Sequence, residues 1–126
     1  MKKKLILLLA FISIFYLSSC KKAVEADIEG DWKKMDMNNP LSSQYEMWHI
    51  KEGAFYIVKV SSSGAQTQLY KGEYIIKNKF YLFQRLFSIT SCTNQDLVRD
   101  WKIIKLTDNY LTLMSKDGVQ YEYKRL

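Results

Sequence analysis

Few residues in this sequence are of the types found in catalytic or metal sites, and their spacing matches no known motif of either kind of site. The chain has one histidine, His49, so a metal site made of paired histidines is excluded, and no Cys-x-x-Cys motif is present. It also lacks a Gly-x-Ser-x-Gly elbow and a glycine-rich phosphate loop. Asp96 and Asp100 read as a solvated pair, and nothing near Cys92 in sequence marks its thiol as activated. We therefore predict that the protein is not an enzyme and has no catalytic residue, no metal and no cofactor.

Cys20 stands where an apolar stretch ends, and its position predicts a modification rather than catalysis. Three lysines at positions 2–4 precede the apolar stretch LILLLAFISIFYL (residues 5–17), which has the length of a signal-peptide core. That is shorter than the roughly 20 residues that a membrane-spanning helix needs. The segment LSSC (17–20) resembles the bacterial lipobox, whose cysteine becomes the first residue of the mature protein and carries lipid.

The lipobox reading predicts three regions: a signal peptide (1–19), the lipidated Cys20 with a short polar tether (20–27), and a folded domain (28–126). The alternatives are an ordinary signal peptide with an incidental cysteine, or an uncleaved membrane helix. Lys21, rather than an acidic residue, follows Cys20, and by resemblance to enteric sorting rules this predicts an outer-membrane protein facing the periplasm. The membrane is then a partner through the lipid on Cys20.

Charge and cysteine content limit the function of the folded part. Removing residues 1–19 removes three lysines, so the formal charge falls from +6 to +3, and we predict no nucleic-acid partner. Once Cys20 carries lipid, Cys92 has no cysteine to pair with, so no disulfide framework is expected. A chain of this length supports one domain with a modest core.

Short runs rich in Tyr, Phe, Trp, Ile and Val alternate with turn residues along the folded part, which predicts an all-β domain. The expected strands are 28–37, 45–51, 54–60, 67–77, 79–87, 98–106, 109–115 and 119–125. Tight turns at 51–53, 77–78 and 107–109 alternate with the longer polar connections 37–44, 61–66 and 88–96. In an antiparallel meander, alternate connections lie at the same end, so this order predicts an eight-stranded up-and-down barrel with an open rim and a closed floor. The tight connection at 116–118 is the exception on the rim side.

Several segments resemble those of small bacterial lipocalin-like lipoproteins. The opening Ile28-Glu29-Gly30-Asp31-Trp32 contains the Gly-x-Trp pattern of lipocalins, and WKIIKL (101–106) followed by TDN (107–109) fits the same family. The C-terminal part of the chain resembles the end of such a barrel, in the segments LTLM (111–114), Asp117-Gly118 and YEYKR (121–125). The resemblance implies a lipocalin-like barrel that holds a small apolar or amphipathic ligand. It also implies that Arg125 packs over the Trp32 indole, and strand direction independently places both residues at the closed end.

Alternation along the strands predicts a mainly aromatic and aliphatic interior. The residues expected to point inward are Trp48, Ile50, Phe55, Ile57, Tyr70, Tyr74, Ile76, Phe80, Leu82, Trp101, Ile103, Leu111, Leu113, Tyr121 and Tyr123. Of these, Trp48, Tyr70 and Trp101 are expected nearest the rim and are the predicted contacts of a ligand in a shallow pocket. The competing interpretation is that these three rings pack on one another and seal the barrel. The alternative is a ligand-free barrel scaffold whose rim loops contact another protein of the cell envelope. An interior filled with bulky side chains up to the rim would favour that scaffold.

Overall fold

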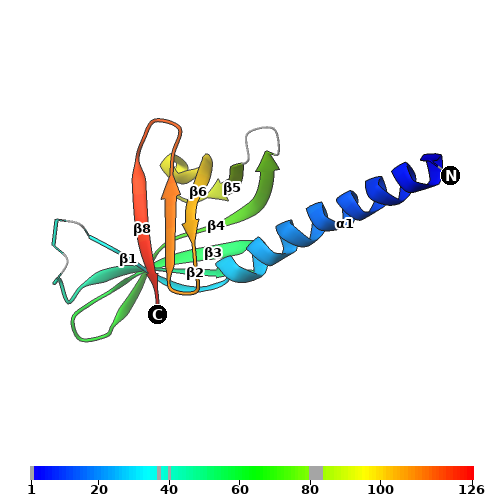
Figure 1. The fold of residues 1–126 in the computed structure, drawn as a ribbon. Helices are drawn as coiled ribbons and strands as arrows, with labels where there is room; N and C mark the ends of the chain where they lie inside the picture. The colour runs from blue at the N-terminus through cyan, green and yellow to red at the C-terminus, as the bar shows by residue number, and fades with distance from the viewer. Residues whose placement is uncertain (1, 37, 40, 80–83) are drawn as a thin grey trace.

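The structure is a computed structural model that describes residues 2–36, 38–39, 41–79 and 84–126, and for residues 10–21 it describes the backbone only. One long helix precedes the strands (Figure 1). The elements are α1 (Lys2–Ile28), β1 (Gly30–Lys34), β2 (Tyr45–Lys51), β3 (Ala54–Val60), β4 (Gln66–Lys79), β5 (Gln84–Cys92), η2 (Gln95–Leu97), β6 (Asp100–Leu106), β7 (Tyr110–Met114) and β8 (Gln120–Arg125). Among the described residues, no helix combines the length and apolarity needed to cross a membrane.

The described strands form a closed antiparallel barrel in which each strand pairs with its neighbours in sequence, in the order β1 to β8. β1 closes the ring by pairing with β8, where Trp32 is opposite Arg125 and Lys34 is opposite Tyr123. The predicted eight-stranded up-and-down barrel is therefore confirmed. β2 and β3 have the predicted bounds, and β6, β7 and β8 differ from their predicted bounds by at most two residues.

The hairpin between β4 and β5 differs from the prediction. Lys77 and Asn78, expected as a tight turn, lie in β4 and pair with Leu86 and Arg85, and β5 continues to Cys92. Most of the predicted loop 88–96 is therefore strand. The segment was predicted to be a loop because it is rich in polar residues. A polar residue can still lie in a buried strand: the Ser88 hydroxyl is buried and donates to Asp100 Oδ1 at 2.6 Å. Phe80 and Leu82, expected in the interior, lie outside the described residues.

The start of the domain also differs from the prediction. The expected strand 28–37 is shorter, because α1 continues to Ile28 and β1 begins only at Gly30. Residues 20–27, expected as the lipidated cysteine and a short polar tether, belong to the last turns of the helix. Val24 and Ile28, four positions apart on one helix face, are buried against the barrel. In the helical conformation, both apolar side chains are on the face that packs against the barrel, so their burial stabilises this end of the helix.

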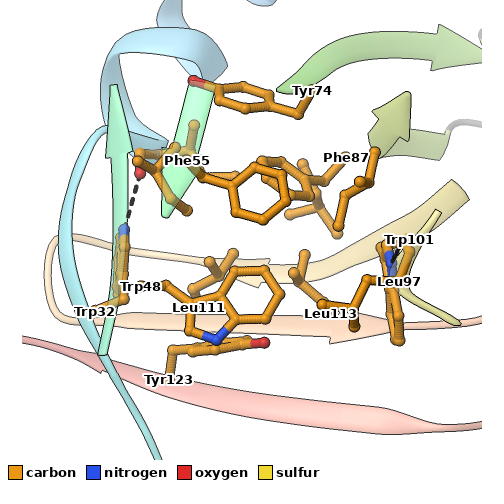
Figure 2. Close-up of a cluster of buried hydrophobic side chains, with 14 of the residues drawn as sticks. Trp32, Trp48, Phe55, Tyr74, Phe87, Leu97, Trp101, Leu111, Leu113 and Tyr123 are labelled. Carbon is orange, nitrogen blue, oxygen red and sulfur yellow. Dashed lines mark hydrogen bonds between the residues drawn. The ribbon is translucent and has the colours of Figure 1, made fainter. Parts of the chain in front are cut away.

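The barrel interior is filled by one cluster of buried side chains that includes residues of β1 to β8 (Figure 2). Every described residue that was expected to point inward belongs to the cluster or packs against it. The cluster has additional members that were not expected to point inward: Val24 of the expected tether, Ile28 and Phe87 of expected strands, Ile89 and Cys92 of the expected loop 88–96, and Leu97. The Phe87 ring is stacked on Tyr74 with centroids 4.6 Å apart, which links β4 to β5 inside the barrel. The predicted interior is thus extended by the end of α1 and by β5.

Candidate functional site

The closed end of the barrel holds the two residues that were expected to lie there together. The Arg125 guanidinium carbon lies 4.2 Å from the centroid of the Trp32 ring. Trp32 is fully buried, and its Nε1 donates to the carbonyl oxygen of Ile28 at 2.8 Å. Arg125 Nη1 donates to the carbonyl oxygen of Glu29 at 2.8 Å. These contacts hold the end of α1, β1 and β8 together, which gives the pair a structural role.

The few side chains that could take part in catalysis or metal binding are spread over the barrel. His49 points outward from β2, contacts Asp31 through Nδ1 and stacks on Tyr56 at 4.6 Å between centroids. Cys92 is a free, buried cysteine of the core. Asp100 is held by Ser88 and lies 3.8 Å from Lys77 Nζ. Among the described side chains, no group of three or more His, Cys, Asp and Glu residues could hold a metal ion.

Two of the three predicted ligand contacts are core residues. Trp48 and Trp101 are 1% and 2% exposed. Trp48 stacks on Phe55 with centroids 5.5 Å apart, and Trp101 donates through Nε1 to the carbonyl oxygen of Leu97 at 3.2 Å. Tyr70 is partly buried and packs against the same core. The structure therefore places these rings below the rim, where they fill the interior.

Tyr123 lies next to Trp48, beneath it in Figure 2, with ring centroids 5.2 Å apart. It is 1% exposed, and its hydroxyl has no hydrogen-bond partner among the described residues. Burial raises the pKa of this hydroxyl well above its ordinary value, and the nearby Glu46 and Tyr121 raise it further. The hydroxyl therefore stays neutral well into the alkaline range.

An open pocket of about 710 Å³ lies above this filled interior, at the rim between the β1–β2 connection and the start of β8. Its lining is mostly polar and comes from β1, β2, β3, β4 and β8 together with the β1–β2 connection: Lys33, Lys34, Met35, Asp36, Asn39, Ser42, Gln44, Tyr45, Glu46, Lys59, Leu69 and Gln120. None of Trp48, Tyr70 and Trp101 belongs to this lining. The pocket is thus a feature of the rim rather than of the barrel interior.

The lining of this rim pocket contains an ion pair, Lys34 and Glu46, that contacts aromatic rings of the barrel. Lys34 Nζ lies 3.8 Å from Glu46 Oε2 and 3.9 Å from the centroid of the Tyr121 ring. Glu46 Oε1 also accepts a hydrogen bond from Trp48 Nε1 at 3.0 Å. Lys34 and Glu46 are neighbours across β1 and β2, each two residues from a core tryptophan. Period-two alternation from Trp32 and Trp48 could have identified both residues as inward-facing.

A second open pocket of about 890 Å³ is lined by residues of β2, β3 and β4, the β2–β3 turn and the end of β5. Its lining includes His49, Tyr56 and Thr93. Thr93 exchanges backbone and side-chain hydrogen bonds with Lys71 of β4. The segment 88–96, expected at the rim with the other long connections, therefore contributes to the side of the barrel instead.

The architecture is similar to that of a lipocalin-like protein from Bacteroides uniformis, known from a crystal structure. The two chains are 15% identical, the TM-score is 0.52, and the match covers 79% of this chain and 99% of that chain. The fold is therefore lipocalin-like, as the sequence resemblance implied. No protein-family model matches the chain, and no curated protein sequence matches it.

Proposed function

We propose that the chain is a lipid-anchored protein of the cell envelope that binds a small amphipathic ligand with an acidic group at the rim pocket. The observation that carries this proposal is the open rim pocket above a filled interior. Its charged lining consists of three lysines and two carboxylates. The excess positive charge favours an acidic group on the ligand, and Tyr45 and Leu69 offer contacts to a short apolar part.

The anchoring part of the proposal rests on the sequence around Cys20. Cleavage before Cys20 would leave the end of α1 in the mature protein, because Val24 and Ile28 lie beyond that point. The lipid on Cys20 then attaches the barrel to the outer membrane on its periplasmic side. In cells, Cys20→Ser should give an unprocessed precursor without lipid. A lipid-modified mature protein from that variant would contradict the assignment.

Binding is proposed rather than catalysis because the side chains that could take part in catalysis do not converge on the rim pocket. His49 and Asp31 face outward on the barrel wall, whereas Cys92 is buried in the core. The pocket lining offers charge and hydrogen bonds, which suit recognition of a ligand.

Ligand binding can be tested with the full chain in lipid nanodiscs. We expect octanoate to shift the tryptophan emission, because Trp48 is hydrogen-bonded to Glu46 of the pocket lining, whereas neutral octanamide should have a weaker effect. Lys59→Met should weaken octanoate binding about three- to tenfold, because one exposed charge at the site is worth about 1 kcal/mol. The matched control is Lys124→Met, since Lys124 is exposed on β8 and lies outside the pocket. Equal responses to both amphipaths, or no effect of Lys59→Met, would contradict the proposal.

A second candidate function is a ligand-free scaffold whose rim loops contact another envelope protein. The filled interior favours it, because large side chains such as Trp48 and Tyr123 occupy the space that a deep ligand would need. A folded protein that ignores both amphipaths would favour this scaffold over the ligand-binding function.

A further inference from the structure

The end of α1 is an integral part of the barrel rather than a flexible tether. Val24 and Ile28 are 3% and 0% exposed and belong to the barrel core. The carbonyl oxygen of Ile28 accepts the hydrogen bond from Trp32 Nε1. Buried apolar contacts and a buried hydrogen bond at the same helix end fix its position relative to the barrel.

Arg125 adds a second connection between this helix end and the opposite end of the chain. Its Nη2 donates to the carbonyl oxygen of Asp27 at 2.5 Å, and its Nη1 donates to that of Glu29 at 2.8 Å. Figure 1 shows α1 leaving the barrel on the right, whereas the β1–β2 and β3–β4 connections of the rim lie on the left. The chain therefore enters the barrel at its closed end.

Cys20 is only four residues before Val24. Four residues span about 6 Å along a helix and at most about 14 Å when fully extended. A lipid on Cys20 would therefore hold the closed end within a short distance of the membrane. We infer that the closed end of the barrel rests against the lipid surface and that the rim pocket points away from it. This inference rests on the proposed lipidation of Cys20.

The surface at the closed end suits this contact. Tyr110, which follows the turn between β6 and β7, is 45% exposed, and Lys105 Nζ lies 5.0 Å from the centroid of its ring. Tyrosine and lysine side chains favour the interface between lipid and water, because each has an apolar part and a polar end. The exposed Lys51 is the last residue of β2, at the β2–β3 turn of the same end.

The orientation limits where a ligand can come from. β2 spans the distance between the rim and the closed end with seven residues, and at about 3.3 Å per residue and a tilt of about 40° this corresponds to roughly 18 Å. A ligand that remains embedded in the anchoring bilayer cannot span that height. The rim pocket must therefore receive its ligand from the aqueous phase or from a soluble partner.

Photo-crosslinking of the full chain in its native membrane tests the orientation. A photoreactive residue, p-benzoylphenylalanine, replaces Asp108 in the β6–β7 turn of the closed end or Ser63 in the β3–β4 connection of the rim. We expect at least fivefold more lipid adduct at position 108 than at position 63. The matched control Tyr110→Ser in the position-108 protein should lower the adduct yield only slightly, because the anchor sets the orientation.

The same samples distinguish the two possible failures. Intact mass of each purified protein reports whether Cys20 carries lipid. A lipidated protein with equal adduct yields, or with more adduct at position 63, would overturn the orientation and leave the anchoring intact. A protein without lipid would overturn both the anchoring and the orientation that rests on it.

Discussion

The Arg125 guanidinium covers the face of the Trp32 indole at 4.2 Å and joins three separate parts of the chain. Besides the carbonyl oxygens of Asp27 and Glu29, it donates through Nε to the carbonyl oxygen of Asp108 at 2.6 Å. The end of α1, the β6–β7 turn and the end of β8 therefore meet on one side chain. Arginine suits this position because its planar fork donates in several directions while one face stacks on a ring.

Replacing Arg125 should destabilise the barrel through the loss of this junction. We expect Arg125→Ala to lower the free energy of unfolding by about 2–4 kcal/mol, since it removes charge-assisted hydrogen bonds and a cation–π contact. Arg125→Lys should recover only part of this loss, because an ammonium cannot reproduce the fork. Urea unfolding of the full chain in detergent measures both values. The neighbouring, exposed Lys124→Ala is the control and should change the value by less than about 0.5 kcal/mol.

Gly30 at the closed end should be difficult to replace. Its φ of +132° is unfavourable for other residues, and a Cβ there would lie 2.7 Å from Arg125 Nη1. We expect Gly30→Ala to destabilise the fold by about 2–4 kcal/mol through strain and displacement of the guanidinium. Gly118→Ala isolates the strain, because Gly118 also has a positive φ but has open space around it. Equal losses in both variants, measured by urea unfolding, would show that the approach of Arg125 has no energetic consequence.

The order of the strands could be predicted from the sequence because each strand has its own alternation and most are separated by strong turn signals. The β4–β5 hairpin could not, because Lys77 and Asn78 resemble a turn by type while pairing continues through them. Whether a Lys-Asn pair forms a turn depends on the partner strand, which local propensity does not report. The docking of α1 was missed for a similar reason, because Val24 and Ile28 are too few to stand out in a polar segment.

The candidate site was predicted less well than the fold. Trp48 and Trp101 were assigned to a rim pocket because large amphipathic rings suit ligand contacts, but neighbouring side chains cover both. How far a side chain lies below the rim depends on the stagger of the strands around the barrel, which the sequence does not contain. The lysines and Glu46 of the pocket belong to no sequence motif. The only signal in the sequence is that Lys34 and Glu46 are each two residues from a core tryptophan, which predicts that they face inward.

The β7–β8 turn should contain a carboxyl group whose titration reports its hydrogen bonds. The Ser115 hydroxyl, the backbone N–H of Asp117 and the Arg99 guanidinium hold the pKa of the Asp117 carboxyl below its ordinary value. We expect Ser115→Ala to raise this pKa more than Arg99→Gln does, because the Ser115 hydrogen bond is the largest single cause of the lowered pKa. Carboxyl carbon chemical shifts, recorded by NMR as a function of pH, measure the pKa in each variant. The opposite order would show that the charge of Arg99 dominates.

Tyr123→Phe should make the protein more resistant to alkali. The folded-state pKa of Tyr123 lies well above the ordinary value of 10.0, so between these two values the unfolded chain loses a proton that the folded chain keeps. The free energy of unfolding should then fall with rising pH, by about 1.4 kcal/mol per pH unit above pH 10 for this group. Below pH 10 both states are protonated and Tyr123 contributes no slope. Removing the hydroxyl should remove this part of the alkaline slope.

The same substitution should not destabilise the protein at neutral pH. The Tyr123 hydroxyl is buried without a partner among the described residues, so its loss removes a desolvation cost of about 1–3 kcal/mol, offset by the small cavity that remains. Urea unfolding of the full chain at pH 7 and at pH 10.5 measures both effects. Tyr110→Phe is the matched control, because Tyr110 is exposed on the barrel surface. An unchanged slope in Tyr123→Phe would mean that the hydroxyl titrates at its ordinary pKa and is therefore solvated in the folded protein.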